Sequence, residues 1–168
     1  SYFDSANFSA SRLINNLRAK AVLCPGLEIV FSDKVNGNEH RWLYEDGLKD
    51  YLAEGVKGYT LLPEEPFTGE FKAETEAANW AIIWQPEGGD QITESYVNLI
   101  PTALGGTHVN GLRQGLLDAM REFCEFRNLL PRGVKLTGDD IFDRCSYVLS
   151  IKMQDPQFAG QTKERLSS

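Results

Sequence analysis

The sequence has few of the residues that bind metals or form disulfide frameworks. Its three cysteines, Cys24, Cys124 and Cys145, are widely separated and odd in number, which argues against a set of disulfides. Its two histidines, His40 and His108, share no metal-ligand spacing with each other or with a cysteine. We therefore expect reduced, buried thiols, a cytoplasmic protein, and no metal site within this chain.

Positive charge and long apolar runs are also scarce. The chain has 17 Lys and Arg residues against 24 Asp and Glu residues, a formal net charge of -7. Such a chain lacks the strongly positive field that non-specific binding of DNA or of a membrane surface usually needs. No apolar run approaches membrane-spanning length, and no basic start followed by an apolar stretch opens the sequence. The sequence thus predicts no membrane segment and no signal peptide.

The sequence does contain enough apolar material for a core. From 168 residues, of which 42% are hydrophobic, we predict a single domain over residues 1–168 that is a fragment of a longer chain. Ser9 precedes a helical pattern and is a possible N-cap. Asn36–Gly37 is typical of a tight two-residue hairpin turn, and Asp46 precedes a short amphipathic helix.

The middle and the end of the chain contain both strand and helix patterns. Segments 67–74, 76–85 and 94–100 alternate apolar and polar residues and are joined by short loops, which predicts three consecutive strands in an antiparallel meander. Behind Thr107, a predicted N-cap, a broad apolar stripe runs to Leu130 and predicts a long helix lying on the sheet. TGDD predicts a capping box and a short helix, and YVLSIKM predicts a last strand. This order favours an α+β fold, a mostly antiparallel sheet covered by helices.

Several polar clusters lie at predicted helix starts. Gly105–Gly106–Thr107–His108 could bind an anion through free N–H groups, but a sharp bend capped by Thr107 is the simpler interpretation. We expect His108 to be a surface or supporting residue rather than a ligand. The helix dipole alone explains the carboxylate pairs Glu45–Asp46 and Asp139–Asp140. No nucleophile-elbow motif accompanies any Ser-His-Asp combination.

The closing run AGQTK is a different kind of motif. Gly160 permits unusual backbone angles, and Gln161, Thr162 and Lys163 present an amide, a hydroxyl and an ammonium in succession. This donor set suits phosphate oxygens. Taken alone, however, a lysine near a chain end is more simply interpreted as part of a solvated tail.

Longer motifs change that interpretation. The runs IPTALGGTHVNGLRQGL and DPQFAGQTKERL, together with LRAKAVLCPGLEIVF, YEDGLKDYL and PEGGDQITESYVNLIP, closely resemble the B subunits of bacterial DNA topoisomerase IV and, more distantly, of gyrase. The resemblance covers nearly the whole chain. It implies a transducer domain with the fold of the second domain of ribosomal protein S5, in which a left-handed βαβ crossover passes through the long helix. Such a crossover departs from the general right-handed preference.

The resemblance also implies a role for the closing run. In this family the loop enters the ATP site of the preceding domain, so Gln161 and Lys163 would contact the terminal phosphate of ATP. Lys163 would then stabilise the transition state in trans to the ATPase domain. Departure of the phosphate would release the loop and let the transducer rotate, coupling ATP hydrolysis to DNA strand passage, decatenation and relaxation. ATP and Mg²⁺ would be bound mainly by the N-terminal domain.

The partners implied are the N-terminal ATPase domain of the same chain, a second copy of this chain, the A subunit of topoisomerase IV and double-stranded DNA. Motifs for ATP hydrolysis and DNA cleavage are not recognisable in this chain, so the fragment by itself is expected to be inactive.

The family's dimer encloses a DNA cavity. Its candidate lining residues here are Arg12, Arg18, Lys20, Arg113, Arg121, Arg127, Arg132 and Lys135. For each of them, scattered solvated charge is the alternative.

A non-catalytic nucleic-acid-binding or assembly module on the same fold is the alternative function. It would require a basic sheet face and an aromatic platform, and it would not need Lys163. Trp80 and Trp84 could form such a platform, but their alternation with Ile82 favours positions in the core. A mismatch-repair or chaperone relative with the same two-domain plan is disfavoured by GGTHVNGLRQGL, which is typical of the topoisomerases.

Overall fold

The computed structural model describes residues 9–168 and divides the chain into two compact units. The first unit ends at Tyr51, and the second comprises Leu52–Ser168. The described strands of the two units belong to separate sheets, one of two strands and one of five, so each unit has its own hydrogen-bonded framework. The assignment of residues 1–168 to one domain stays a prediction.

The first unit consists mainly of a helix and a hairpin. Its elements are α1 (Ala10–Leu23), β1 (Ile29–Asp33) and β2 (Asn38–Trp42). The Ser9 hydroxyl caps α1 by accepting a hydrogen bond from the backbone N–H of Arg12, as predicted. The predicted hairpin is confirmed, but its turn comprises residues 34–37 rather than two residues. The longer turn is stabilised by the Asp33 carboxylate, which accepts hydrogen bonds from the backbone N–H groups of Val35 and Asn36.

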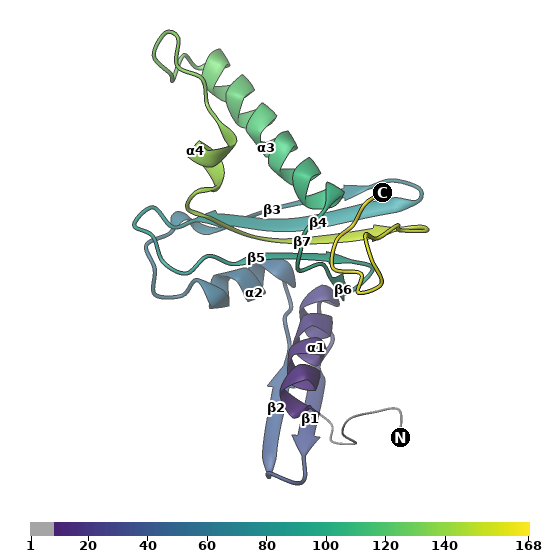
Figure 1. Ribbon diagram of the computed structural model, residues 1–168. Helices are drawn as coiled ribbons and strands as arrows, with labels where there is room; N and C mark the ends of the chain where they lie inside the picture. The colour runs from purple at the N-terminus through teal and green to yellow at the C-terminus, as the bar shows by residue number, and fades with distance from the viewer. Residues whose placement is uncertain (1–8) are drawn as a thin grey trace. The chain divides into compact units, whose positions relative to one another are not determined.

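The second unit contains the larger sheet and the remaining helices (Figure 1). Its elements are α2 (Leu48–Gly55, whose first residues belong to the first unit), β3 (Leu62–Lys72), β4 (Glu76–Trp84), β5 (Thr93–Val97), β6 (Ile100–Pro101), α3 (Thr107–Phe126), α4 (Gly138–Phe142) and β7 (Cys145–Met153). The strand order is β3-β4-β7-β5-β6, and all neighbouring strands are antiparallel except β5 and β7. The predicted α+β class with a mostly antiparallel sheet is confirmed.

The third predicted strand of the meander does not pair with the second. β7 lies between β4 and β5, antiparallel to the first and parallel to the second, so the meander prediction is wrong for β5. The reason is visible in burial: the six residues Cys145–Ser150 are all buried, as expected of a central strand covered on both faces. The chain passes from β5 to β7 through α3 and α4, which forms the expected crossover. Its left-handed sense stays a prediction.

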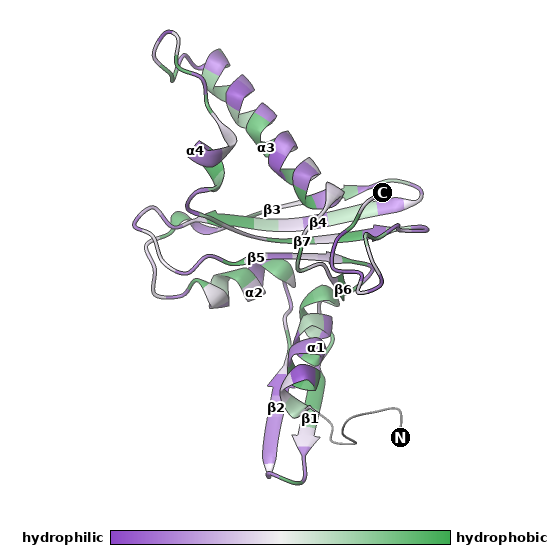
Figure 2. Cartoon of the chain, viewed as in Figure 1, coloured by the Kyte–Doolittle hydropathy of each residue, from purple (hydrophilic) through white to green (hydrophobic). Residues whose placement is uncertain are grey.

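The long helix covers the sheet only in part. Figure 1 shows α3 rising from the sheet, with its N-terminal end near the strands. Leu112 and Leu116 pack against a core that includes Ile82, Phe142 and Leu149, whereas Phe126 at the other end is 82% exposed. In Figure 2 the colour of α3 alternates between apolar and polar along its length. Among the described residues, no helix combines the length and the apolar character that a membrane crossing requires.

Candidate functional site

The C-terminal segment 157–168 folds back on itself and forms a loop. The backbone N–H of Ala159 donates to the carbonyl of Arg165 over 2.9 Å, and that of Ser167 donates to the carbonyl of Gln157 over 2.8 Å. An antiparallel bridge also joins Phe158 to Leu166. The interpretation of this segment as a solvated tail, which rested on the closing run alone, is therefore wrong for the base of the loop, because its backbone groups are paired.

The tip of the loop exposes the predicted phosphate-binding side chains. Gln161, Thr162 and Lys163 are all exposed. The Thr162 hydroxyl donates to the Glu164 carboxylate over 3.2 Å. The Lys163 ammonium lies 6.0 Å from the centre of the Phe158 ring, at the limit of a weak cation–π interaction. This arrangement leaves an amide and an ammonium available to an anion that approaches the tip.

The base of the loop lies against the turn that precedes α3. The backbone N–H of Leu104 donates to the carbonyl of Glu164 over 2.8 Å, and that of Leu166 donates to the carbonyl of Gly105 over 3.0 Å. A third hydrogen bond, of 3.2 Å, runs from the N–H of Thr107 to the carbonyl of Leu166. Leu166 is 3% exposed and is the buried residue of segment 157–168. A single leucine between two polar runs was the sequence signal for this anchor, and the sequence interpretation missed it.

Thr107 is not the N-cap of α3, contrary to prediction. The N-cap is Gly106, which has no side chain to cap the helix. Thr107 is the first residue of the helix, and its hydroxyl donates to the carbonyl of Ser168 instead. The Leu166 carbonyl accepts the first N–H of the helix. An intramolecular carbonyl thus occupies a donor that would otherwise be available to an external anion.

His108 belongs to a polar chain that links the first turn of α3 to β5. Its Nε2 lies 2.9 Å from the Thr102 hydroxyl, which is 2.7 Å from the Ser95 hydroxyl. Ser95 and Thr102 are buried. The buried Nδ1 of His108 has no hydrogen-bond partner, and burial lowers the pKa of the ring below its usual value. We interpret His108 as a neutral supporting residue of the turn.

Three of the predicted DNA-lining residues are half-buried and make intramolecular contacts. Arg18 hydrogen-bonds to the Tyr44 hydroxyl over 3.4 Å. The Arg113 guanidinium lies 4.3 Å from the centre of the Phe142 ring. The Nε of Arg121 donates to the carbonyl of Leu136 over 2.7 Å. These contacts give each arginine a structural role within its unit.

The remaining predicted basic residues are divided between the two units. Arg12 and Lys20 lie on α1 in the first unit. In the second unit, three exposed cations lie at and beyond the C-terminal end of α3: Arg127, Arg132 and Lys135. The two sets are far apart in the chain.

The alternative platform residues and the carboxylate pair have structural roles. Trp80 and Trp84 pack against the core, and the indole N–H of Trp84 donates to the carbonyl of Ile141 over 2.7 Å. The core interpretation of both residues is confirmed. Asp140 forms the predicted capping box with Thr137, whose hydrogen bonds lower the pKa of the carboxyl group. Across residues 9–168, no three His, Cys, Asp or Glu side chains gather as metal ligands.

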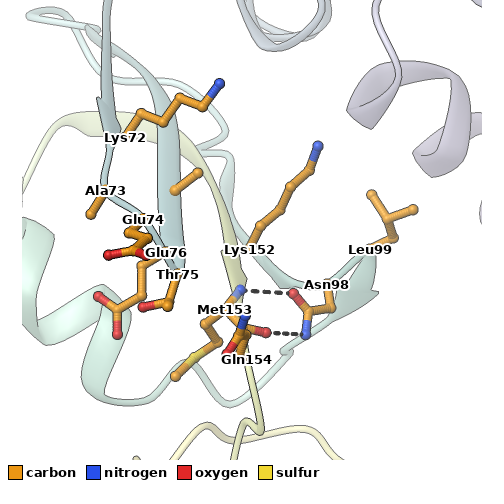
Figure 3. A pocket seen from close by; sticks show the side chains of 11 residues that line it. Lys72, Ala73, Glu74, Thr75, Glu76, Asn98, Leu99, Lys152, Met153 and Gln154 are labelled. Atoms are coloured by element: carbon orange, nitrogen blue, oxygen red, sulfur yellow. Dashed lines mark hydrogen bonds between the residues drawn. The ribbon is translucent and has the colours of Figure 1, made fainter.

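Two hollows of the second unit lie apart from the loop tip. An apolar groove of about 580 Å³ lies between α3 and the sheet, and Leu112, Leu116 and Trp80 line it. The second hollow, of about 520 Å³, lies at the end of the sheet (Figure 3). There the Asn98 amide exchanges two hydrogen bonds with the backbone of Met153, of 2.8 and 2.9 Å. Neither hollow is lined by a residue of the loop tip.

Comparison with known proteins identifies the family. The family model described as DNA gyrase B matches residues 47–168, and the chain belongs to this family. It is 72% identical, over 168 residues, to the B subunit of DNA topoisomerase 4 from Salmonella typhimurium, and it is 75% identical, over 167 residues, to the corresponding protein of Haemophilus influenzae. These alignments cover 100% and 99% of this chain but only 27% and 26% of the relatives. The chain therefore spans about a quarter of their length.

Solved structures agree with this assignment. The topoisomerase IV ATP-binding domain of Francisella tularensis, in complex with a small-molecule inhibitor, is 40% identical with a TM-score of 0.82. The 43K ATPase domain of Thermus thermophilus gyrase B, in complex with an aminocoumarin, is 28% identical with a TM-score of 0.83. Each match covers 99% of this chain and 44% of the solved chain. The fold is thus that of ATPase regions of this family.

Proposed function

We propose that the second unit is the transducer of a topoisomerase IV B subunit, which couples ATP turnover in an adjacent domain to DNA strand passage. The family match from residue 47 onwards, close to the start of this unit, supports the assignment. The first unit then belongs to the neighbouring ATP-binding domain. The observation that carries the proposal is the loop with a paired base and an exposed tip, which presents Gln161 and Lys163 outward.

Lys163 and Gln161 are the residues of this chain that would meet the nucleotide. Their amide and ammonium donors fit the oxygens of a terminal phosphate. When the terminal phosphoryl group is transferred to water, negative charge shifts toward the leaving oxygens, and an ammonium placed there stabilises the transition state more than the ground state. Because the tip is exposed, the rest of the site must come from the ATP-binding domain.

Mg²⁺ would be held mainly by the ATP-binding domain and by the nucleotide itself. The ion prefers oxygen ligands and is usually bound through one or two carboxylates together with substrate phosphates. When bound, the nucleotide would supply the phosphoryl group, and the metal would neutralise part of its charge. The contribution proposed for the second unit is the two donors at the tip and the framework that holds them.

The base of the loop offers a route for the coupling. The backbone hydrogen bonds between segments 104–107 and 164–166 tie the loop to the start of α3. Loss of the terminal phosphate removes the attraction on Lys163, and the loop with its attached helix becomes able to move relative to the ATP-binding domain. In the whole enzyme, this motion would act together with a second copy of this chain, the A subunit of topoisomerase IV and the DNA duplex.

The test is the substitution Lys163→Ala in the intact protein. We expect kcat for ATP to fall about 100-fold to 1,000-fold, as for loss of one transition-state donor, with a smaller change in KM. Lys152→Ala is the matched control, because Lys152 is also an exposed lysine of the second unit (Figure 3) and lies outside the loop. Normal turnover by the Lys163→Ala protein would contradict the proposed role of the tip.

A further inference from the structure

The loop that carries Lys163 is joined to α3 by a short parallel ladder. Segment 164–166 runs parallel to segment 104–107, with a bridge between Gly106 and Leu166. Its three backbone hydrogen bonds, of 2.8, 3.0 and 3.2 Å, involve Leu104, Gly105 and Thr107 on one side and Glu164 and Leu166 on the other. We call this ladder the loop clamp. It begins at Glu164, the residue next to Lys163.

Gly106 occupies a position in the loop clamp that no other residue fits. Its φ of 134° is a backbone conformation that side chains strongly disfavour. A Cβ atom at this position would also lie 2.2 Å from the carbonyl oxygen and 2.6 Å from the nitrogen of Leu166. Both neighbours are backbone atoms, so rotation of a side chain cannot relieve the clash. Any side chain at Gly106 therefore has to displace the segment that follows Lys163.

Two glycines farther along α3 provide the contrast. A Cβ atom added at Gly111 or Gly115 would meet no atom within 4 Å, and neither residue has a positive φ. Alanine also favours a helix interior over glycine. The same substitution is therefore expected to displace the loop at Gly106 and to leave it in place at Gly111.

We propose that Gly106 and Leu166 are positioning residues for Lys163. The proposal rests on the proposed function of Lys163 and assigns the loop clamp the task of holding the ammonium at a fixed place relative to α3. Lys163 itself has a φ of 57°, a conformation that a non-glycine residue adopts at a cost. The paired residues of the clamp hold the chain directly after it, and the exposed tip has little else to fix its position.

The test compares Gly106→Ala with Gly111→Ala in the intact protein through two measurements. The first is limited trypsin digestion, because Lys163 and Arg165 are cleavage sites in the loop. We expect faster cleavage there in Gly106→Ala than in the wild type or in Gly111→Ala. The second is ATP turnover, where we expect kcat to fall about tenfold or more in Gly106→Ala, as for a displaced catalytic group, with a smaller effect on KM.

Leu166→Ala provides a second route to the same result. It removes the buried anchor without adding an atom, so it tests the clamp even if Gly106→Ala fails to fold. We expect the same gain in cleavage and the same fall in kcat. The proposal would be overturned if a folded Gly106→Ala or Leu166→Ala protein were cleaved in the loop at the wild-type rate. It would also be overturned if these variants were cleaved faster but kept the wild-type kcat, while Lys163→Ala lowered kcat. If Lys163→Ala turns over ATP normally, the proposed function fails, and the cleavage rates alone decide whether the clamp holds the loop.

Discussion

The two ends of α3 differ in what holds them, although one apolar stripe runs through both. At the N-terminal end, Thr107 is hydrogen-bonded to Leu166 of the loop, and His108 contacts Thr102 of the turn after β6. At the C-terminal end, Phe123 and Phe126 are 55% and 82% exposed. α3 is thus anchored where the loop meets the helix, and its far end is exposed.

With one anchored end and one exposed end, α3 would be able to transmit a motion along its length. A helix of 20 residues is about 30 Å long and moves nearly as a rigid body. A displacement of the loop would therefore be carried along α3 to its exposed end, where Arg127, Arg132 and Lys135 lie. Substitutions at each end of α3 can test this contrast.

The largest expected effect is on the stability of the loop clamp when a side chain at either end of α3 is truncated. Leu166→Ala should lower the free energy of local opening at the loop clamp by about 2–3 kcal/mol, the low end for a buried leucine. Phe126→Ala should change it by less than about 0.5 kcal/mol, because an exposed side chain loses little on truncation. Hydrogen exchange of the Leu166 and Thr107 amides in the intact protein measures both. Equal effects of the two substitutions would show that Leu166 is no more important to the loop clamp than the exposed Phe126.

A smaller effect is expected from charge reversal at the exposed end. Changing Arg127, Arg132 and Lys135 to Glu should weaken the stimulation of ATP turnover by duplex DNA and reduce its salt dependence by about one unit of slope per lost phosphate contact. Stability should be nearly unchanged because all three residues are exposed. Lys57→Glu, at an exposed lysine outside this set, is the control. If stimulation persists unchanged in the triple variant, these residues do not line a DNA path.

The smallest effect is the pH dependence that His108 gives to the anchored end. Burial lowers the pKa of His108 below the usual 6.5, so in acid the unfolded chain binds a proton more readily than the folded one. Stability should therefore be full above the unfolded pKa and fall as the pH drops below about 6.5. His108→Gln should remove this part of the acid loss. Comparing the Tm of both proteins at neutral and mildly acidic pH checks the sign; an equal acid loss in both would exclude His108 as its source.

Several features of the fold were predictable from local sequence. Ser9 and Thr137 are helix caps because their hydroxyls reach N–H groups three residues away, and such contacts are readable in a short window. The order of helices and strands followed from periodicity for the same reason. The exposed donors at Gln161 and Lys163 were also readable, since a polar run beside a glycine is seldom buried. Their role in ATP turnover still stands as a prediction.

Other features could not be read in this way. Thr107 was expected to cap α3, but the carbonyl of Leu166 takes that place from a distant part of the chain. The pairing of β7 with both β4 and β5 also depends on contacts between segments that are far apart in the chain. Its alternating pattern is compatible with several partners, and only burial on both faces selects the central position. The division into two units likewise depends on which strands share a sheet.

Propensity, capping and turn chemistry act over a few neighbouring residues, so local sequence was enough to predict most helices and strands, their order and the exposed donors of the closing run. The central place of β7 in the sheet and the contact of Leu166 with Gly106 at the start of α3 arise only in the folded chain. These contacts join segments far apart in the chain. Their energy comes from burial and backbone pairing that exist only once the fold has brought the segments together.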